Sequence, residues 1–141
     1  MKKLILPVIL SSIPSVVLAE SACGYLHISI QNYTGGVCKL QAANVMSGSL
    51  VSGQVPKLIY NGEMSSSFQM QQGYFSGPAI QLIYNCKNKS ISLTSKQNLC
   101  FLAAGGITGD VNTANNLHAR YLPYEGSYWS SKPGAIVWTI V

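Results

Sequence analysis

The chain contains few of the side chains that carry acid–base chemistry. Its 141 residues include only four Asp and Glu and two His, whereas general acid–base catalysis needs titratable groups close to one another. The sequence also has no Gly-x-Ser-x-Gly elbow, no His-Glu-x-x-His motif and no glycine-rich phosphate loop before a helix. Glu63, Asp110 and Glu125 each stand next to a glycine, which is typical of turns. We therefore expect a protein that is not an enzyme and that uses no cofactor.

Patterns for metal and nucleic-acid binding are also lacking. The four cysteines form no Cys-x-x-Cys pair, and His27 and His118 each stand alone, so we expect no metal site. The basic residues are scattered, with one local concentration at Lys87, Lys89 and Lys96. Nucleic-acid binding requires a denser stripe of Lys and Arg. We therefore expect no nucleic-acid partner.

Apolar residues, by contrast, dominate the first 19 positions. Behind Lys2 and Lys3 the segment has a short apolar middle and ends on the small residue Ala19, as a secretory signal peptide does. Proline and serine interrupt its apolar part, which is shorter than the roughly 20 residues that span a bilayer. We predict a signal peptide of bacterial type over residues 1–19. Residues 20–141 would then form a single secreted domain of net charge +3, or a periplasmic one if it is not exported further.

Cys23 suggests an alternative, in which residues 1–22 are the leader of a lipoprotein. Ser21-Ala22-Cys23 resembles the end of a lipidation box, in which the cysteine carries a membrane anchor. Glu20 stands three residues before the cysteine, where such a box has an apolar side chain. We therefore favour the soluble protein that cleavage after Ala19 releases.

The cysteines predict disulfide bonds. Four cysteines in a secreted chain of this size indicate two disulfides, for which three connectivities are possible. Their order along the chain favours Cys23 with Cys38 and Cys86 with Cys100. Each such pair closes a loop of about 15 residues, and chain entropy then contributes roughly 3 kcal/mol to stability.

Apolar and polar residues alternate with a period of two, which predicts β-strands. No stretch of a dozen residues has a helical period free of Gly or Pro. About nine or ten short strands suggest an antiparallel sandwich or barrel, and we favour an all-β fold with a single antiparallel β-sandwich. The expected strands are 26–30, 37–43, 48–51, 57–60, 65–70, 79–86, 90–94, 99–104, 117–122 and 135–141.

Three segments carry more specific expectations. Asn61-Gly62 predicts a two-residue hairpin, because both positions tolerate positive φ. The terminal run 135–141 predicts a central strand buried on at least one face, since an exposed edge of this composition would promote aggregation. The segment 105–110 contains one imperfect copy of a calcium-binding glycine repeat. A flexible loop leading into the polar run 112–116 is the preferred interpretation.

The densest functional candidate is a group of aromatic residues near the C-terminus. Tyr and Trp have flat apolar faces and a polar edge, which suit a membrane interface, a sugar ring or a quaternary ammonium group. The alternative is a hydrophobic plug whose rings face the core. The residues are Tyr121, Pro123, Tyr124, Tyr128 and Trp129.

Several motifs resemble the actinoporin-like β-sandwich group, which includes sea-anemone cytolysins and fungal sugar-binding lectins. The motifs are Ile28–Gly35 as an opening strand and turn, then Ser47-Gly48, Pro56 and Gly62, then Gly77–Tyr84 as a central strand, and Pro123-Tyr124-Glu125 followed by Tyr128-Trp129. In the cytolysins the last segment receives a phosphocholine head group. The resemblance therefore implies a β-sandwich with a lipid or glycan site at these aromatic residues.

The chain departs from the cytolysin pattern in ways that bear on function. The cytolysins have a long amphipathic N-terminal segment that enters the membrane, whereas few residues separate the expected cleavage site from Leu26. Their core has no cysteines, and the spacing of the aromatic segment differs. The resemblance thus implies surface binding without pore formation by that route.

The sequence predicts a secreted binding protein that recognises a lipid head group or glycan on a cell surface through the aromatic residues. A toxin-like or lectin-like effector is the form that this function suggests. The alternative is a structural or inhibitory protein that binds a host or cell-surface protein by a sheet edge.

Overall fold

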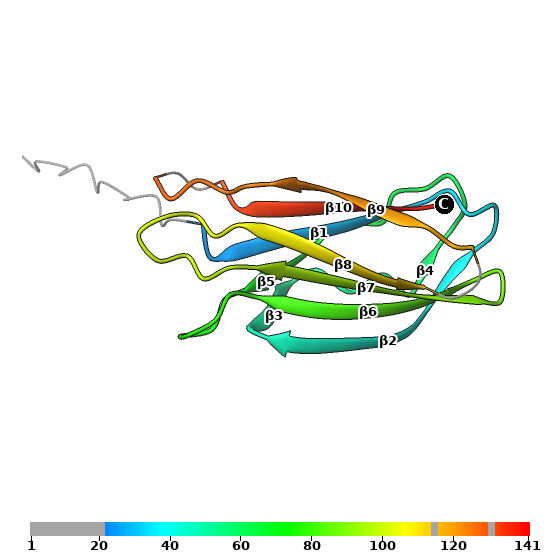
Figure 1. Cartoon of the computed structure of the whole chain (residues 1–141), viewed down its shortest axis with the longest axis horizontal. Helices are drawn as coiled ribbons and strands as arrows, with labels where there is room; N and C mark the ends of the chain where they lie inside the picture. The colour runs from blue at the N-terminus through cyan, green and yellow to red at the C-terminus, as the bar shows by residue number, and fades with distance from the viewer. Residues whose placement is uncertain (1–21, 114–115, 130–131) are drawn as a thin grey trace, which may run out of the picture.

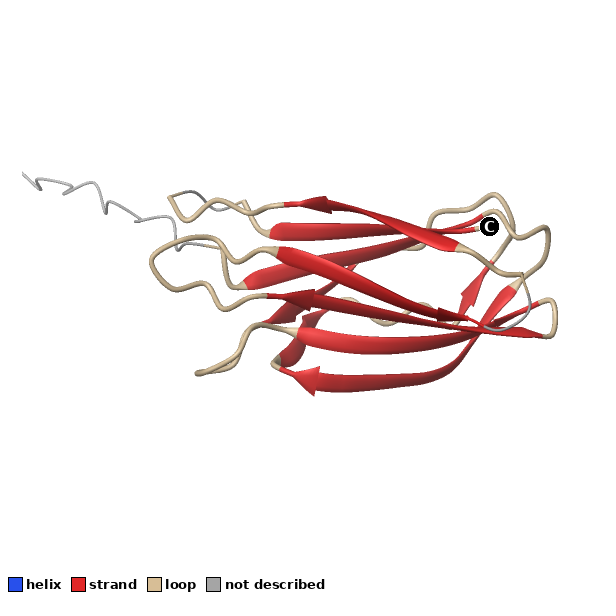
Figure 2. Cartoon of the chain, in the orientation of Figure 1, coloured by secondary structure: helices blue, strands red, loops and turns tan. Residues whose placement is uncertain are grey.

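The structure is a computed structural model, and it describes residues 22–113, 116–129 and 132–141. The predicted signal peptide lies outside the described residues. Within those ranges no helix is long and apolar enough to cross a membrane. The observed elements are all strands (Figure 2), which confirms the all-β prediction.

The described residues form ten strands in two sheets. Sheet A has the order β3-β5-β1-β10-β9, and sheet B has the order β4-β2-β6-β7-β8. The strands are β1 (Tyr25–Asn32), β2 (Cys38–Ser47), β3 (Ser49–Ser52), β4 (Leu58–Ile59), β5 (Phe68–Gln71), β6 (Ala79–Cys86), β7 (Lys89–Gln97), β8 (Ile107–Thr113), β9 (Ala119–Tyr124) and β10 (Gly134–Ile140).

The two sheets pack face to face as a sandwich (Figure 1), as predicted. β10 lies between β1 and β9, so the terminal apolar run does form a central strand with one buried face. One pair differs from a wholly antiparallel arrangement, because β1 and β10 run parallel from Leu26 beside Gly134 to Asn32 beside Ile140. Parallel neighbours need a long connection between them, and the eight strands between β1 and β10 supply it.

The core lies between the sheets and follows from the period-two pattern. Every second residue of β1 and β10 is buried, and Trp138 is the largest fully buried side chain. The Trp138 Nε1 donates a hydrogen bond to Ser95 Oγ of sheet B at 2.8 Å. Tyr84 is also buried, and its hydroxyl donates to the Pro56 carbonyl at 2.7 Å. Burial raises the pKa of Tyr84 above its usual value, because the charged phenolate loses its hydration.

The two predicted disulfides are present, but their connectivity corrects the favoured one. Cys23 is bonded to Cys100, and Cys38 is bonded to Cys86. The favoured pairs are neighbours in sequence, yet β1 separates Cys23 from Cys38 and β7 separates Cys86 from Cys100. A strand of eight residues spans roughly 26 Å, so each of those pairs has its members at opposite ends of the sandwich. Antiparallel pairing instead places Cys38 directly beside Cys86.

The segment around residues 99–113 also corrects the sequence prediction. The expected strand 99–104 is a loop, and residues 107–110 of the expected glycine-rich loop 105–110 belong to β8. Gly105 packs closely on the residue that follows β7, because a Cβ at Gly105 would lie 1.8 Å from the carbonyl oxygen of Asn98. β8 tolerates its polar composition because it is the edge strand of sheet B, with Ile107 as its one buried side chain.

The Asn61-Gly62 turn forms, although it does not connect a hairpin. Gly62 has φ of 81°, and the backbone N–H of Glu63 donates to the Tyr60 carbonyl at 3.1 Å. Before the turn β4 pairs with β2 in sheet B, whereas after it Met64 bridges to Gln31 in sheet A. The turn therefore carries the chain from one sheet to the other.

Asn32 fixes the loops at this end of the sandwich. Its buried Nδ2 donates to the carbonyls of Gly36 and Ile59 at 2.7 Å each, and its Oδ1 accepts from the N–H (2.9 Å) and hydroxyl (2.7 Å) of Thr34.

We expect Asn32→Ala to lower the free energy of unfolding by about 2 kcal/mol, because buried partners lose their hydrogen bonds. Urea denaturation measures this, with Asn61→Ala as the matched control, since Asn61 makes an exposed hydrogen bond to Gly35. An equal loss in both variants would contradict the prediction.

Candidate functional site: an apolar loop end and an adjoining cleft

Three loops and the segment before β1 meet at one end of the sandwich, on the left in Figure 1. The loops connect β5 to β6 (72–78), β7 to β8 (98–106) and β9 to β10, of which residues 125–129 and 132–133 are described. The end of β7 joins these segments. The N–H of Gln97 donates to the Pro78 carbonyl at 3.0 Å, and its side-chain Nε2 donates to the Cys23 carbonyl at 3.2 Å.

These loops present the most exposed apolar side chains that the structure describes. Five of them are between 74% and 95% exposed, whereas every other large apolar side chain in the described ranges is 60% exposed or less. Exposed apolar side chains that gather at one place are typical of interaction sites. We call the group the apolar tip: Tyr74, Phe75, Phe101, Leu102 and Trp129.

A tight turn presents the first two tip residues. The N–H of Gly73 donates to the Ser76 carbonyl at 3.0 Å, which places Tyr74 and Phe75 at the two central positions of the turn. Behind them Gly77 packs directly on β7, where a Cβ would lie 1.7 Å from the Gln97 carbonyl oxygen. The turn is thus held against the end of sheet B with both aromatic rings directed into solvent.

The β7–β8 loop holds the next two tip residues. Its base is closed by a hydrogen bond from the N–H of Asn98 to the Gly106 carbonyl at 2.9 Å, and the Cys23–Cys100 disulfide anchors the loop directly before Phe101. Leu102 has φ of 64°, a left-handed conformation that costs roughly 1–2 kcal/mol for a residue with a Cβ. Leu102 is therefore exposed even though its backbone conformation is unfavourable. Strain of this kind is often found at functional sites, which favours a functional role for this residue.

The β9–β10 loop brings two of the predicted aromatic residues to the same end. Trp129 is 90% exposed, and Tyr128 is half-buried with its ring edge-on to Trp129 at a centroid distance of 4.8 Å. The other candidates lie on β9. Pro123 and Tyr124 are exposed near its end, whereas Tyr121 is half-buried and packs on Trp138 with ring centroids 5.1 Å apart. The structure thus brings Trp129 to the tip and Tyr128 to the same end of the sandwich, and it places Tyr121 against the core.

The tip carries little charge. Loops 72–78 and 98–106 contain no Asp, Glu, Lys or Arg, and in the third loop Glu125 and Lys132 flank the aromatic pair. Removing a charge from water costs several kcal/mol unless it is paired. Loops 72–78 and 98–106 can therefore leave water without the free-energy cost of dehydrating a charged side chain.

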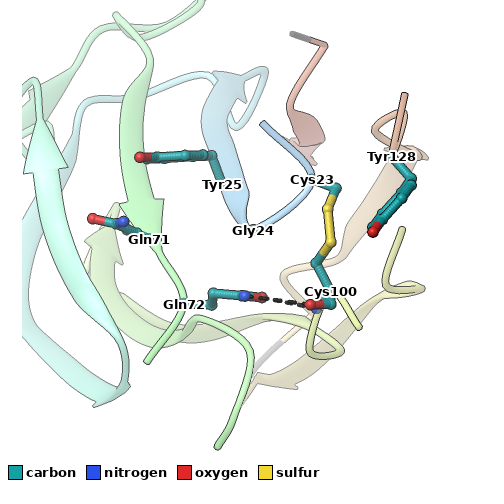
Figure 3. A pocket seen from close by; sticks show the side chains of 7 residues that line it. All are labelled: Cys23, Gly24, Tyr25, Gln71, Gln72, Cys100 and Tyr128. Carbon is teal, nitrogen blue, oxygen red and sulfur yellow. Dashed lines mark hydrogen bonds between the residues drawn. A yellow bond between two sulfur atoms is a disulfide. The ribbon is translucent and has the colours of Figure 1, made fainter. Parts of the chain in front are cut away.

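An open cleft of ≈ 390 Å³ lies at the base of the tip (Figure 3). The Cys23–Cys100 disulfide lies between Tyr25 on one side and Tyr128 on the other. Gln72 points toward Cys100, where its Oε1 accepts from the backbone N–H at 2.8 Å and its Nε2 donates to the carbonyl at 3.5 Å. The lining residues are Cys23, Gly24, Tyr25, Gln71, Gln72, Cys100 and Tyr128.

A second depression of ≈ 420 Å³ adjoins the first one. The two share Gln71 and Gln72, and the second extends along Ser49 to Tyr74 of the tip. Neither is lined by a charged residue. The described residues contain no group of three His, Cys, Asp or Glu side chains that could hold a metal ion.

Sequence reasoning did not single out four of the five tip residues. Tyr74-Phe75 stands in the Gly- and Ser-rich segment 73–77, and two adjacent aromatic residues in such a turn are a signal that could have identified them. Phe101 and Leu102 lie inside the segment that was expected to be a strand, where apolar residues are ordinary. Their exposure follows only from the loop conformation.

The fold is similar to those of several solved proteins, although no protein-family model and no curated protein matches the sequence. The lipid binding protein Nakanori has a TM-score of 0.66 at 12% identity, with 82% of this chain and 70% of that one covered. RahU, solved with a Tris molecule, has a TM-score of 0.61 at 7% identity over 86% and 98% of the chains. IP-1A from Alcaligenes faecalis has a TM-score of 0.57 at 14% identity over 86% and 93%. These likenesses support the resemblance to a known β-sandwich group at the level of the fold.

Proposed function

We propose that the protein binds the lipid surface of a membrane peripherally through its apolar tip. The observation that carries this proposal is that, of the large apolar side chains in the described residues, the five most exposed lie on three loops at one end of the sandwich. The fold likeness to a protein described as lipid binding supports the same class of ligand. Trp129, predicted from the sequence, belongs to this surface, and the predicted Tyr128 lines the cleft beside it.

The proposed mechanism is adsorption without spanning. Aromatic side chains are favoured at the level of lipid head groups, where their apolar faces leave water while their polar edges remain solvated. Burying one Phe or Leu side chain contributes roughly 1.5–3 kcal/mol, so the five tip residues together can retain the protein at a membrane. The sandwich itself remains in water, because the large apolar side chains in its other described loops, Tyr33, Tyr60 and Met64, are each less than 55% exposed.

A secreted protein fits this function. The two disulfides suggest an oxidising environment, and the predicted leader over residues 1–19 directs the chain there. The proposed partner is therefore a lipid or glycan on a cell surface that the released protein meets. Neither a catalytic step nor a cofactor is part of the proposal.

The exposed sheet edge at β2 is a second candidate surface, which would bind a protein partner. β4 pairs only with Cys38 and Lys39, so the later part of β2 has one neighbouring strand, and Val45 and Met46 there are 51% and 57% exposed. Two register shifts interrupt this part of β2, and bulges of this kind hinder the addition of another strand. The apolar tip is therefore the better-supported surface.

Replacing tip residues tests the proposed function. We expect Phe75→Ser and Phe101→Ser each to weaken binding to phosphatidylcholine vesicles by about tenfold, because each removes roughly 1.5 kcal/mol of apolar burial. Co-sedimentation with the vesicles measures the affinity. In both variants Trp129 remains as a reporter, and its fluorescence emission should shift to the blue when vesicles are added to the unaltered protein.

Tyr60→Ser is the matched control for this experiment. Tyr60 is also an exposed aromatic residue, at 52%, but it lies at the opposite end of the sandwich beside the Asn61-Gly62 turn. We expect it to leave vesicle binding unchanged, and all three variants should keep the thermal midpoint, since exposed substitutions cost within about 0.5 kcal/mol. Absence of vesicle binding by the unaltered protein, or equal losses in all three variants, would contradict the proposal and favour the sheet edge.

A further inference from the structure

The cleft at the base of the tip offers neutral polar groups that the fold does not use. Within the described ranges, the side-chain amide of Gln71 and the hydroxyls of Tyr25 and Tyr128 have no hydrogen-bond partner in the protein, and all three side chains are half-buried. A primary amide offers a donor and an acceptor at once, and a phenol does the same. Such groups match a ligand that is rich in hydroxyls.

The same lining disfavours charged head groups. A phosphate is normally bound by Arg or Lys, and neither depression is lined by a basic side chain. A quaternary ammonium group is held over the faces of several aromatic rings, whereas Tyr25 and Tyr128 lie on opposite sides of the Cys23–Cys100 disulfide (Figure 3). A neutral sugar requires neither a basic side chain nor a cage of aromatic rings. Its apolar face can stack on a single aromatic ring while its hydroxyls form hydrogen bonds with side-chain amides.

The floor of the cleft is fixed before any ligand arrives. The disulfide lies across it, and the two hydrogen bonds between Gln72 and the Cys100 backbone hold the amide of Gln72 in place. Groups that are already positioned lose little entropy when a ligand binds. The adjoining depression shares Gln71 and Gln72 and adds Ser49 and Tyr74, so a second sugar unit would meet the same kind of groups.

The position of the cleft relates it to the membrane. Cys100 immediately precedes Phe101, and Tyr128 immediately precedes Trp129, so the cleft lies directly behind two tip residues. When the tip enters the apolar side of the interface, the cleft reaches the layer of the head groups. Resting on the proposed membrane binding, we infer that the cleft binds the neutral sugar head group of a glycolipid, with Gln71 and Tyr128 as contact residues.

Vesicles with and without a neutral sugar head group test this inference. We expect the protein to bind phosphatidylcholine vesicles that contain a ceramide with a neutral disaccharide head group about tenfold more tightly than phosphatidylcholine alone, as a few neutral hydrogen bonds provide. Gln71→Ala should remove this gain and leave binding to phosphatidylcholine unchanged. Gln69→Ala is the matched control, because Gln69 lies two residues earlier on the same strand and lines neither depression.

The outcomes separate this inference from the proposed function. Equal binding to both vesicles, or a gain that Gln71→Ala retains, would overturn the sugar site while the apolar tip stands. Preference for vesicles with an anionic phospholipid over those with the glycolipid would also overturn it. The same disaccharide coupled to a soluble protein identifies the source: weak binding there supports a lipid-borne sugar, whereas equal binding without any lipid would overturn the glycolipid assignment. Failure to bind any vesicle would instead contradict the proposed function.

Discussion

Trp138→Ala is expected to lower the free energy of unfolding by about 3–5 kcal/mol, because it removes the largest fully buried side chain and leaves a cavity between the sheets. The substitution also removes the hydrogen bond to Ser95 Oγ and the packing surface of Tyr121. A loss of this size is a large part of the stability of a small domain. Urea denaturation followed by circular dichroism measures it.

The chain supplies its own control for this substitution. It contains two tryptophans, and Trp129 is 90% exposed at the tip, so Trp129→Ala should change the free energy of unfolding within about 0.5 kcal/mol. Trp138→Phe keeps most of the volume but leaves the buried Ser95 hydroxyl without a partner. Its cost should therefore fall when Ser95→Ala is added. Similar losses at Trp138 and Trp129 would contradict the assignment of one to the core and the other to the tip.

The difference between the two tryptophans also shows what the sequence could predict. Trp138 stands in an alternating apolar run, and period-two alternation identifies a strand with one buried face wherever the pattern is regular, as in β1, β6 and β10. The pattern is weak in β8, which pairs on one side alone and buries only Ile107. Its polar and glycine residues therefore favoured a loop.

The disulfide connectivity and the tip depend on contacts that local patterns do not encode. Proximity in sequence favoured Cys23 with Cys38, but the register of two distant strands places Cys38 beside Cys86. In the same way, Tyr74 and Trp129 are far apart in the chain, and only the sandwich brings their loops to one end. The aromatic composition of residues 121–129 could indicate a binding segment, whereas its partners on the other loops could not be found without the topology.

The Cys23–Cys100 disulfide is expected to control both stability and membrane binding. It closes a segment with a sequence separation of 77, and loss of such a bond typically costs about 2–5 kcal/mol. It also anchors the loop that carries Phe101 and Leu102. We expect the double variant Cys23→Ser/Cys100→Ser to bind phosphatidylcholine vesicles at least about tenfold more weakly, because fixing the backbone of even one released loop residue on the membrane costs roughly 1–2 kcal/mol.

The second disulfide separates these two effects. Cys38–Cys86 has a sequence separation of 48 and joins β2 to β6 at the end of the sandwich away from the tip. The double variant Cys38→Ser/Cys86→Ser should therefore lose a comparable amount of stability, measured by urea denaturation, yet bind vesicles as tightly as the unaltered protein at a temperature where both are folded. If both double variants lost vesicle affinity equally, the loss would follow from general destabilisation, and the Cys23–Cys100 bond would have no particular role in positioning the tip.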